Sequence, residues 1–287
     1  MTKQISPLRQ RMIDDMKIRN MSVNSQKVYA HAIANFSTFH GRSPDKLGIQ
    51  HVREYRLHLL ARGLKATSIN PIVGALRFFY ATTLGKKEIA EQIPYARPAD
   101  TLPAVLTPDE VVRLFAAVPN LKIRTALITI YAAGLRVSEV VALTARNINS
   151  ERMVIEVRQS KGRKDRYVML SEQLLAILRD YWRRTRPTEY LFPGPDPARP
   201  ITARSLQRAC RKAVNAADLS PAVTVHTLRH SFATHLLEQG VDIRVIQDLL
   251  GHRQITSTTR YARVALNTIR HIQSPLELLN MGPTAPA

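Results

Sequence analysis

Apolar residues recur at helical spacing through the first third of the chain. They lie three or four positions apart in four segments, 7–20, 22–41, 48–63 and 67–85. This spacing is the one that a single face of an amphipathic helix requires. Residues 1–96 are therefore predicted to form a module of four helices.

Two of these segments carry local start and stop signals. In the second segment, Ser25 is the expected cap at the start and Gly41 the expected stop. The apolar stripe of that helix consists of Val28, Ala32, Phe36 and Phe39. In the fourth segment, Pro71 is placed near the start of the helix, where a first turn tolerates proline.

A change of composition marks the end of this module. Residues 94–108 contain four prolines and no helical period, which is typical of a linker, and we assign the linker to 97–107. Directly after it, Thr107 is expected to cap a helix that has Pro108 at its first position and Glu110 at its third. A second domain is thus predicted over 108–287.

The second domain has a mixed pattern that is mainly helical. The nearly continuous apolar run 122–134 predicts a buried helix ending at Gly134. In 152–170, two β-branched runs flank a polar stretch and predict a hairpin with Gly162 at its turn. Further helices are expected in 171–185, 202–217, 226–240, 242–252 and 256–272. The predicted fold class is mainly α with a small β-hairpin.

Charge narrows the possible partners. The chain of 287 residues has 42 Lys and Arg against 22 Asp and Glu, a formal net charge of +20. This excess is spread along the chain and indicates a polyanionic partner, with nucleic acid favoured over acidic lipid. The single cysteine excludes an internal disulfide framework and a multi-cysteine zinc site, and it fits a reducing cytoplasm. No apolar run reaches the roughly 18 to 20 residues needed to cross a bilayer.

Several polar residues admit both a structural and a chemical interpretation. His226, His230 and His235 share one predicted helix, but Thr227 stands where the zinc-protease pattern requires glutamate, so His230 and His235 are predicted to be structural. Arg136 either pairs with Glu139 or binds an anion in a cleft. Lys161 either protects an edge strand or takes part in chemistry.

A tyrosine near the C-terminus raises the same question. Tyr261 follows His252 by nine positions and lies between Arg260 and Arg263. Two arginines, two histidines, a lysine and a tyrosine fit phosphoryl transfer at a phosphodiester, because arginine forks match phosphate oxygens and stay protonated. Tyrosine can attack phosphorus once it is helped to lose its proton. Such a reaction needs no metal and no ATP.

The combination of motifs resembles the tyrosine recombinases, also called the phage integrase family, and within it the Xer-type enzymes of bacteria. The stretches that carry the resemblance are AAGLRVSEVVAL, SKGRKDR, HTLRHSFATHLLEQG and LLGHRQITSTTRY. The resemblance covers nearly the whole chain: a helical core-binding (SAM-like) domain, a linker and a catalytic domain. It implies a clamp around double-stranded DNA, site-specific cleavage and rejoining, strand exchange through a Holliday junction, and no cofactor.

Roles for the candidate residues follow from the resemblance. It implies that Arg136 and Arg229 bind the scissile phosphate and that Glu139 supports Arg136. Lys161 would be the general acid, and His226 would accept or orient a proton.

The last motif supplies two further roles. The resemblance implies that His252 donates a hydrogen bond to the phosphate and that Tyr261 is the nucleophile. The chain departs from Xer enzymes after that tyrosine, where Ala262 and Arg263 replace the Thr and His of the common Thr-His-Val. This departure places a strict role in chromosome-dimer resolution in doubt and leaves integration or excision on a mobile element open.

The resemblance also bears on assembly, and two alternative functions stay open. The resemblance implies four protomers on two sites, with the segment 265–279 passing to a neighbouring copy; the alternative is that this segment folds back on its own domain. A partner recombinase is a further possibility. The apolar residues of that segment are Ile269, Ile272, Leu276 and Leu279. The alternatives are a non-catalytic DNA-binding accessory protein, which would form no covalent adduct, and a type IB topoisomerase, which would relax DNA without site preference.

Overall fold

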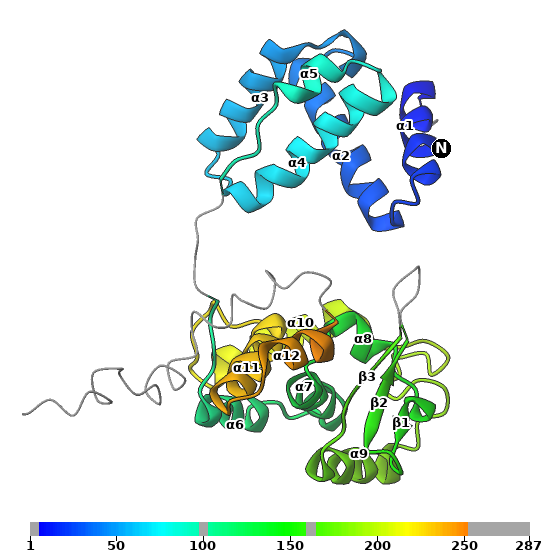
Figure 1. Cartoon of the computed structure of the whole chain (residues 1–287), viewed down its shortest axis with the longest axis vertical. Coiled ribbons are helices and arrows are strands. Elements are labelled where there is room, and N and C mark those ends of the chain that lie inside the picture. The colour runs from blue at the N-terminus through cyan, green and yellow to red at the C-terminus, as the bar shows by residue number, and fades with distance from the viewer. Residues whose placement is uncertain (1–5, 98–102, 159–164, 252–287) are drawn as a thin grey trace, which may run out of the picture. The chain divides into compact units, whose positions relative to one another are not determined.

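The computed structural model describes residues 6–97, 103–158 and 165–251, which fall into two compact units (Figure 1). Unit 1 spans Met1–Thr101 and unit 2 spans Leu102–Ala287. The boundary between them lies within the stretch that has the composition of a linker. Each unit has a hydrophobic core of its own.

Unit 1 consists of helices joined by short turns. The helices are α1 (Pro7–Ile18), α2 (Val23–His40), α3 (Ile49–Ala61), α4 (Ala66–Phe78) and α5 (Lys87–Glu91), with a 3-10 turn η1 (Pro44–Lys46) and a π-helical turn η2 (Phe79–Thr83). The four predicted helices are confirmed as α1 to α4. The short α5 has too few residues to show a helical period in the sequence.

Two local predictions for α2 are wrong. The cap of α2 is Ser22, whose hydroxyl accepts a hydrogen bond from the Ser25 backbone N–H at 3.1 Å. Val28 and Phe39 are 42% and 41% exposed, because the buried face of α2 is centred on Ile33 and these two residues lie beyond its edge. The stop at Gly41, in a left-handed conformation with φ of 62°, is confirmed.

Pro71 also lies elsewhere than predicted. It is inside α4 and not in its first turn, because the helix begins at Ala66. A proline at this position removes one helical hydrogen bond. Asn70 next to it fixes the end of unit 1 through two hydrogen bonds to the backbone of Ala96, at 2.9 and 2.8 Å.

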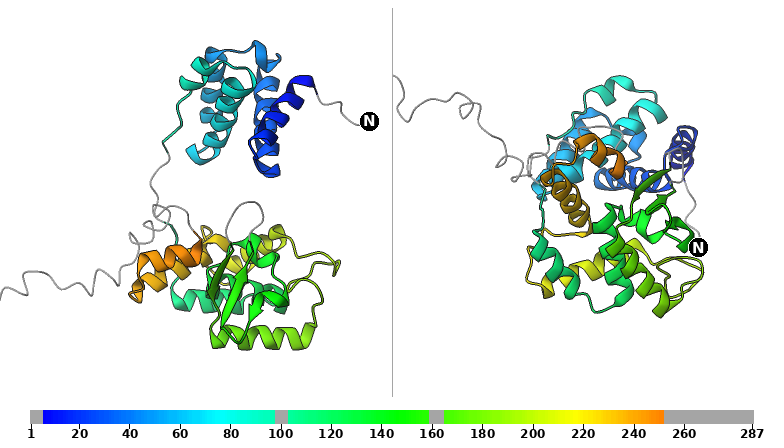
Figure 2. Two further views of the ribbon diagram at one scale, coloured as in Figure 1. Left: turned by 45° about the vertical axis from the view of Figure 1, so that its right-hand side comes forward. Right: turned by 60° about the horizontal axis from the view of Figure 1, so that its bottom comes forward.

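Unit 2 combines helices with one small antiparallel sheet. The helices are α6 (Pro108–Ala116), α7 (Leu121–Ala133), α8 (Val137–Val141), α9 (Glu172–Thr185), α10 (Ala203–Ala216), α11 (Val225–Glu238) and α12 (Ile243–Leu250), with a 3-10 turn η3 (Ala145–Asn147). The strands are β1 (Ile148–Asn149), β2 (Val154–Val157) and β3 (Arg166–Met169), in the order β1-β2-β3. The sheet forms one side of the unit (Figure 2).

The predicted signals in unit 2 agree with these elements. The Thr107 hydroxyl accepts from Glu110 N–H, and the Glu110 carboxylate accepts from Thr107 N–H at 2.8 Å. Helix α7 ends at Gly134 in a left-handed conformation. The two hairpin strands pair with Ile155 opposite Val168, whereas β1 is a third strand of only two residues that the sequence did not reveal. The predicted turn at Gly162 lies outside the described residues, as does the helix expected over 256–272.

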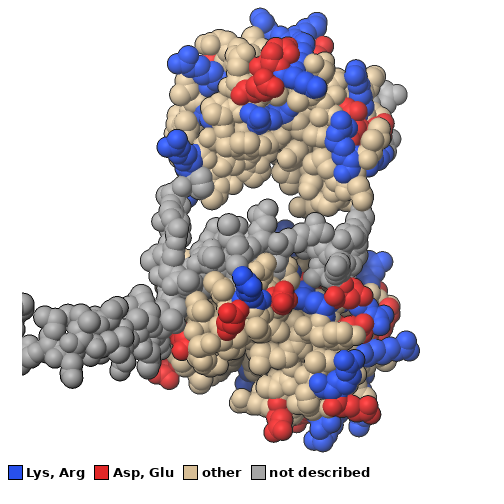
Figure 3. Space-filling view, in the orientation of Figure 1, with Lys and Arg blue, Asp and Glu red and all other residues tan. Residues whose placement is uncertain are grey.

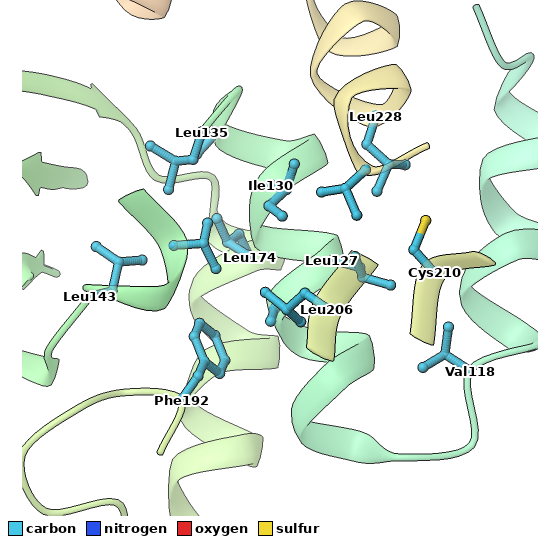
Figure 4. Packing of buried hydrophobic residues seen from close by; sticks show 14 of the residues in the cluster. Val118, Leu127, Ile130, Leu135, Leu143, Leu174, Phe192, Leu206, Cys210 and Leu228 are labelled. Carbon is cyan, nitrogen blue, oxygen red and sulfur yellow. The ribbon is translucent and has the colours of Figure 1, made fainter. Parts of the chain in front are cut away.

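The core of unit 2 is built around α7. Leu127 and Ile130 of this helix are fully buried and belong to one cluster with Leu174 of α9, Leu206 of α10 and Leu228 of α11 (Figure 4). The cluster explains why the α7 sequence is nearly continuously apolar: the helix is covered on several sides. Helix α7 therefore fixes the positions of the elements that carry the candidate site.

The segment before α6, the first helix of unit 2, already packs against that unit. Leu106 is 2% exposed, its N–H donates to Ser231 Oγ at 2.9 Å, and its carbonyl oxygen lies 2.9 Å from His235 Nε2. His235 also bonds to the Tyr131 hydroxyl at 2.8 Å. The prediction that His235 is structural is confirmed, because both its ring nitrogens have protein partners.

Basic side chains are distributed over both units. On the face shown in Figure 3, Lys and Arg are scattered and interspersed with Asp and Glu. No helix in the described parts of the chain is long and apolar enough to span a bilayer.

Candidate active site

One buried carboxylate gathers three arginines from different parts of unit 2. Glu139, on α8, has a side chain that is 7% exposed. Its Oε1 accepts hydrogen bonds from Arg136 at 2.8 Å and from Arg166 at 2.9 Å, and its Oε2 accepts a second bond from Arg166 at 2.9 Å. Arg229 Nη1 lies 3.9 Å from the same Oε2. Because a buried charge is costly unless it is paired, this arrangement indicates a site that is organised by ion pairs.

The surroundings of Glu139 keep it ionised. Burial alone would raise its pKa, but the hydrogen bonds and charge of Arg166, together with the backbone N–H and guanidinium of Arg136, outweigh burial and lower the pKa to about 2. The Arg136 backbone N–H contributes a bond of 2.8 Å. Glu139 is therefore a fixed anion that orients the positive groups around it.

The same three arginines also bind the C-terminal end of α12. Arg166 Nε donates to the Leu249 carbonyl at 2.9 Å, Arg229 Nη2 donates to the Leu250 carbonyl at 2.6 Å, and Arg136 Nη2 donates to the Gly251 carbonyl at 3.2 Å. Carbonyls in the last turn of a helix have no partners within the helix and carry partial negative charge. The arginines supply those partners, and they fix the backbone immediately before His252.

Arg229 is the most buried of the three. It lies on α11, is 3% exposed, and donates to the carbonyl of Gly134 at the end of α7 as well as to that of Leu250. Gly134 has a φ of 61°, and a Cβ at this position would clash with the Phe232 ring. Glycine is needed here both for its backbone conformation and for the close approach of α11.

His226 lies next to this cluster at the start of α11. Partial burial and the positive charges of Arg229 and Arg136 lower its pKa from the ordinary value of 6.5, so its ring stays neutral near pH 7. It lines a cavity of about 330 Å³ together with Leu135, Gln207 and Arg211. A neutral imidazole at the rim of a cavity can accept a proton from a bound group.

The three histidines of α11 differ in their surroundings. His226 faces the cavity, and its ring stacks on that of His230 with centroids 5.9 Å apart. His235 is bound within the protein fold, as described above. In the described residues no cluster of three His, Cys, Asp or Glu side chains could hold a metal ion.

The structure brings Arg136, Glu139, His226 and Arg229 together. The predicted pairing of Arg136 with Glu139 is confirmed, and the Arg136 side chain keeps 22% exposure. Lys161, His252 and Tyr261 lie outside the described residues.

Sequence reasoning missed Arg166. The signal was the two-residue period of the strand: Arg166 and Val168 share a face of β3, and Val168 is buried. An arginine in phase with a buried valine must find partners inside the protein. That inference would have singled out Arg166 before the structure.

Comparison with known proteins decides the family. The model of the phage integrase family matches residues 104–267, and the model of the phage integrase N-terminal SAM-like domain matches residues 8–89. This chain belongs to the phage integrase family. The family match includes the arginine and Glu139 cluster within one continuous region.

Relatives of this phage integrase family member cover nearly its whole length. A protein of Sinorhizobium fredii whose name classes it as an integrase or recombinase is 47% identical, over 98% of this chain and 92% of that relative. Tyrosine recombinase XerA of Pyrococcus furiosus is 36% identical, over 93% of this chain and 91% of that relative. The prediction of a tyrosine recombinase of Xer type, an enzyme that acts on DNA in site-specific recombination, is confirmed.

The fold agrees with this assignment. The structure of the XerH recombinase bound to its palindromic difH substrate superimposes with a TM-score of 0.74, at 19% identity, over 96% of this chain and 86% of that one. The prediction of a mainly helical recombinase with a small sheet is confirmed. Neither the accessory-protein alternative nor the topoisomerase alternative is favoured by these relatives.

Proposed function

We propose that the cluster around Glu139 binds the scissile phosphate of a DNA duplex and that Tyr261 attacks it. One observation carries this proposal: Arg136 and Arg229, from motifs far apart in the sequence, are held by one carboxylate and by the two backbone carbonyls that precede His252. Guanidinium groups fixed in this way can bind phosphate oxygens without rearranging as charge develops.

Each residue of the cluster has a distinct task. Arg136 uses one N–H for Glu139 and one for Gly251. Within the described residues its remaining N–H groups have no other acceptor, and we assign them to the anion. Arg229 is buried, so it adds positive charge in a region of low dielectric, where that charge acts strongly. Glu139 neutralises part of this charge and sets the orientation of Arg136.

All bonds and protons of the proposed cleavage are accounted for without a cofactor. The Tyr261 oxygen forms a bond to phosphorus and gives its proton to a base, which we assign to the neutral His226. The bond from phosphorus to the 5′ oxygen breaks, and Lys161 gives a proton to that oxygen. His252 donates a hydrogen bond to a phosphate oxygen. The 3′-phosphotyrosine keeps the bond energy, and a 5′-hydroxyl of another strand reverses the steps and rejoins the DNA.

The assembly follows from the same proposal. Two sites must be brought together for strand exchange through a Holliday junction, and we propose a tetramer with one protomer on each half-site. The segment 265–279 would link neighbouring protomers, and a partner recombinase could occupy two of the four positions.

Affinity for DNA should come mainly from phosphate contacts and fall steeply with salt, in keeping with the net charge of +20. Site choice would rest on helices such as α10 in the major groove.

Covalent trapping tests the proposal. Nicked duplexes built from DNA that flanks the gene are incubated with the full chain in the presence of EDTA and separated on a denaturing gel. Wild type should give a slow protein–DNA band that Tyr261→Phe lacks. The matched control is Tyr167→Phe, which changes an exposed tyrosine of β3 and should leave the band. A band that persists in Tyr261→Phe would contradict the assigned nucleophile, and tight binding without any band would contradict the catalytic assignment.

A further inference from the structure

Arg166 links three elements of the candidate site. It is the first residue of β3, and its side chain is only 10% exposed. Its two terminal nitrogens each donate to a different oxygen of Glu139 on α8, both at 2.9 Å. Its Nε donates to the Leu249 carbonyl at the end of α12, also at 2.9 Å. One guanidinium thus joins the hairpin, α8 and α12.

The geometry of these contacts fixes directions as well as distances. A two-pronged bond between a guanidinium and a carboxylate holds both groups in one plane. Because Arg166 sets the plane of the Glu139 carboxylate, and Glu139 binds both the guanidinium and the backbone N–H of Arg136, the orientation of Arg136 depends on Arg166. An isolated ion pair would not transmit orientation in this way.

The contact with α12 extends the same effect to the last motif. Besides its bond to Leu249, Arg166 packs against Gly251: a Cβ built at Gly251 would lie 3.1 Å from Arg166 Cδ. Gly251 has a φ of 61° and ends α12. The backbone that leads into His252 is therefore held in place by Arg166 on one side and by Arg136 through the Gly251 carbonyl on the other.

We infer that Arg166 is a positioning residue for DNA cleavage, which aligns Arg136 through Glu139 and fixes the end of α12 without touching DNA. This inference rests on the proposed function, because it takes Arg136 to be a ligand of the scissile phosphate. An apolar residue in phase with Val168 would cover the core at lower cost than a buried charge. Lysine would supply the charge but not the planar fork.

The test separates cleavage from binding and from folding. Arg166→Gln and Arg166→Lys are compared with wild type in single-turnover cleavage of a nicked duplex at saturating protein, and their Kd values are measured by fluorescence anisotropy. Cleavage by Arg166→Gln should fall about 100-fold, as expected for a misplacement of about 1 Å at a reacting centre. Kd should stay within about threefold of wild type, a change of under about 0.7 kcal/mol. Arg166→Lys should recover only part of the loss.

A matched control removes the same charge elsewhere. Arg184 on α9 pairs with Asp180 in an exposed ion pair, with 66% of its side chain accessible. Arg184→Gln should cleave like wild type. The fluorescence of Trp182, the single tryptophan of the chain, reports whether unit 2 of each variant is folded.

A second substrate shows through which residue Arg166 acts. Replacing the leaving 5′ oxygen by sulfur gives a leaving group that needs no proton, because thiols ionise near pH 8.5 (about the value for cysteine). If Arg166 acts through Glu139 and Arg136, this substrate should not restore cleavage by Arg166→Gln. Restoration would show that Arg166 acts on the general acid of the hairpin, and it would overturn the inference.

The cleavage rates and Kd values of the two variants also test the inference. Cleavage by both variants within threefold of wild type would overturn the inference, and so would a loss of DNA affinity as large as the loss of cleavage, because that would mean direct DNA contact. If Arg166→Gln does not fold, Arg166→Lys alone decides by the same criteria. Absence of any adduct with wild type would instead refute the proposed function, so the two failures are distinguishable.

Discussion

The two units bury different kinds of side chain, although both are helical and basic at the surface. Within the described residues of unit 1, Thr83 is the sole buried polar residue, and the core is formed by side chains such as Met16, Phe36 and Tyr80. Unit 2 has an apolar core of its own, but it also buries Arg229 and the carboxylate of Glu139.

This difference separates the requirements of a fold from those of a site. An apolar core stabilises a unit without needing precise partners. A buried charge stabilises nothing by itself and must be paired accurately to be tolerated. Unit 2 buries charge where three arginines meet the carboxylate of Glu139, and we assign catalysis to this region.

Replacing the buried arginine should have the largest effect on stability. Arg229→Met leaves the carbonyls of Gly134 and Leu250 without their donor and weakens the neutralisation of Glu139. We expect a loss of about 4 kcal/mol in the free energy of unfolding of unit 2. Urea titration followed by Trp182 fluorescence measures it. Arg208→Met, at an exposed position of α10, should change stability by less than about 0.5 kcal/mol; equal losses would contradict the contrast.

Acidification should remove a comparable contribution. The pKa of Glu139 is about 2 in the folded protein against an ordinary 4.5, so its ionised form stabilises unit 2 above pH 4.5, and this contribution disappears as the pH falls toward 2. The difference corresponds to about 3 kcal/mol. Urea midpoints of wild type and Glu139→Gln should therefore converge as the pH is lowered from 6 to 2. A gap between the two proteins that does not change with pH would refute the assigned pKa.

Gly41 and Gly134 each end a helix, so replacing them compares how tightly the two units are packed. Gly41 ends α2 with φ of 62°, and Gly134 ends α7 with φ of 61°. A Cβ at Gly41 meets nothing within 4 Å, whereas one at Gly134 would clash with Phe232. Gly41→Ala should cost about 1 kcal/mol from backbone strain alone. Gly134→Ala should cost about 2 kcal/mol more because of overpacking. Thermal unfolding followed by circular dichroism and by Trp182 fluorescence resolves the two, and equal costs would count against the packing argument.

The smallest effect concerns the cap of α2. Ser22→Ala removes the oxygen that accepts from the Ser25 backbone N–H and should lower the stability of unit 1 by about 1 kcal/mol. Ser25→Ala should cost less, because the Ser25 hydroxyl bonds only the Ser22 hydroxyl among the described contacts. Circular dichroism during urea unfolding measures the change. The transition reported by Trp182 fluorescence, which belongs to unit 2, should stay the same, so that the change is assigned to unit 1. The reverse order of the two variants would restore Ser25 as the cap.

The elements of the fold could be read from the sequence where one local rule decided them. Thr107, Gly41 and Gly134 mark helix ends, because capping and the left-handed turn depend on a few neighbouring residues. Ser25 and Pro71 were misplaced, since a helix can begin one turn before its apolar stripe becomes clear. Boundaries of helices are weakly encoded in the sequence for this reason.

The site was readable only in part. The residue types of Arg136 and Arg229 pointed to an anion, but the meeting of Arg136 with Gly251, 115 positions away, depends on tertiary packing. Arg166 was missed because its role arises from the combination of a strand face with the end of α12. The two-residue period of β3 could mark Arg166 as an inward-facing residue, but it does not show which partners on α8 and α12 the side chain meets.

Removing the charge that the arginines are proposed to bind tests whether this cluster binds the scissile phosphate. A duplex with an uncharged methylphosphonate at the scissile position is compared with the ordinary phosphate, for wild type and Arg136→Ala, in single-turnover cleavage. On phosphate, Arg136→Ala should be about 100- to 1000-fold slower than wild type. On methylphosphonate, the two proteins should cleave at rates within about tenfold of each other, because the substrate and its transition state each carry one negative charge fewer for Arg136 to balance. An equal loss on both substrates would contradict the claim that this cluster binds the scissile phosphate.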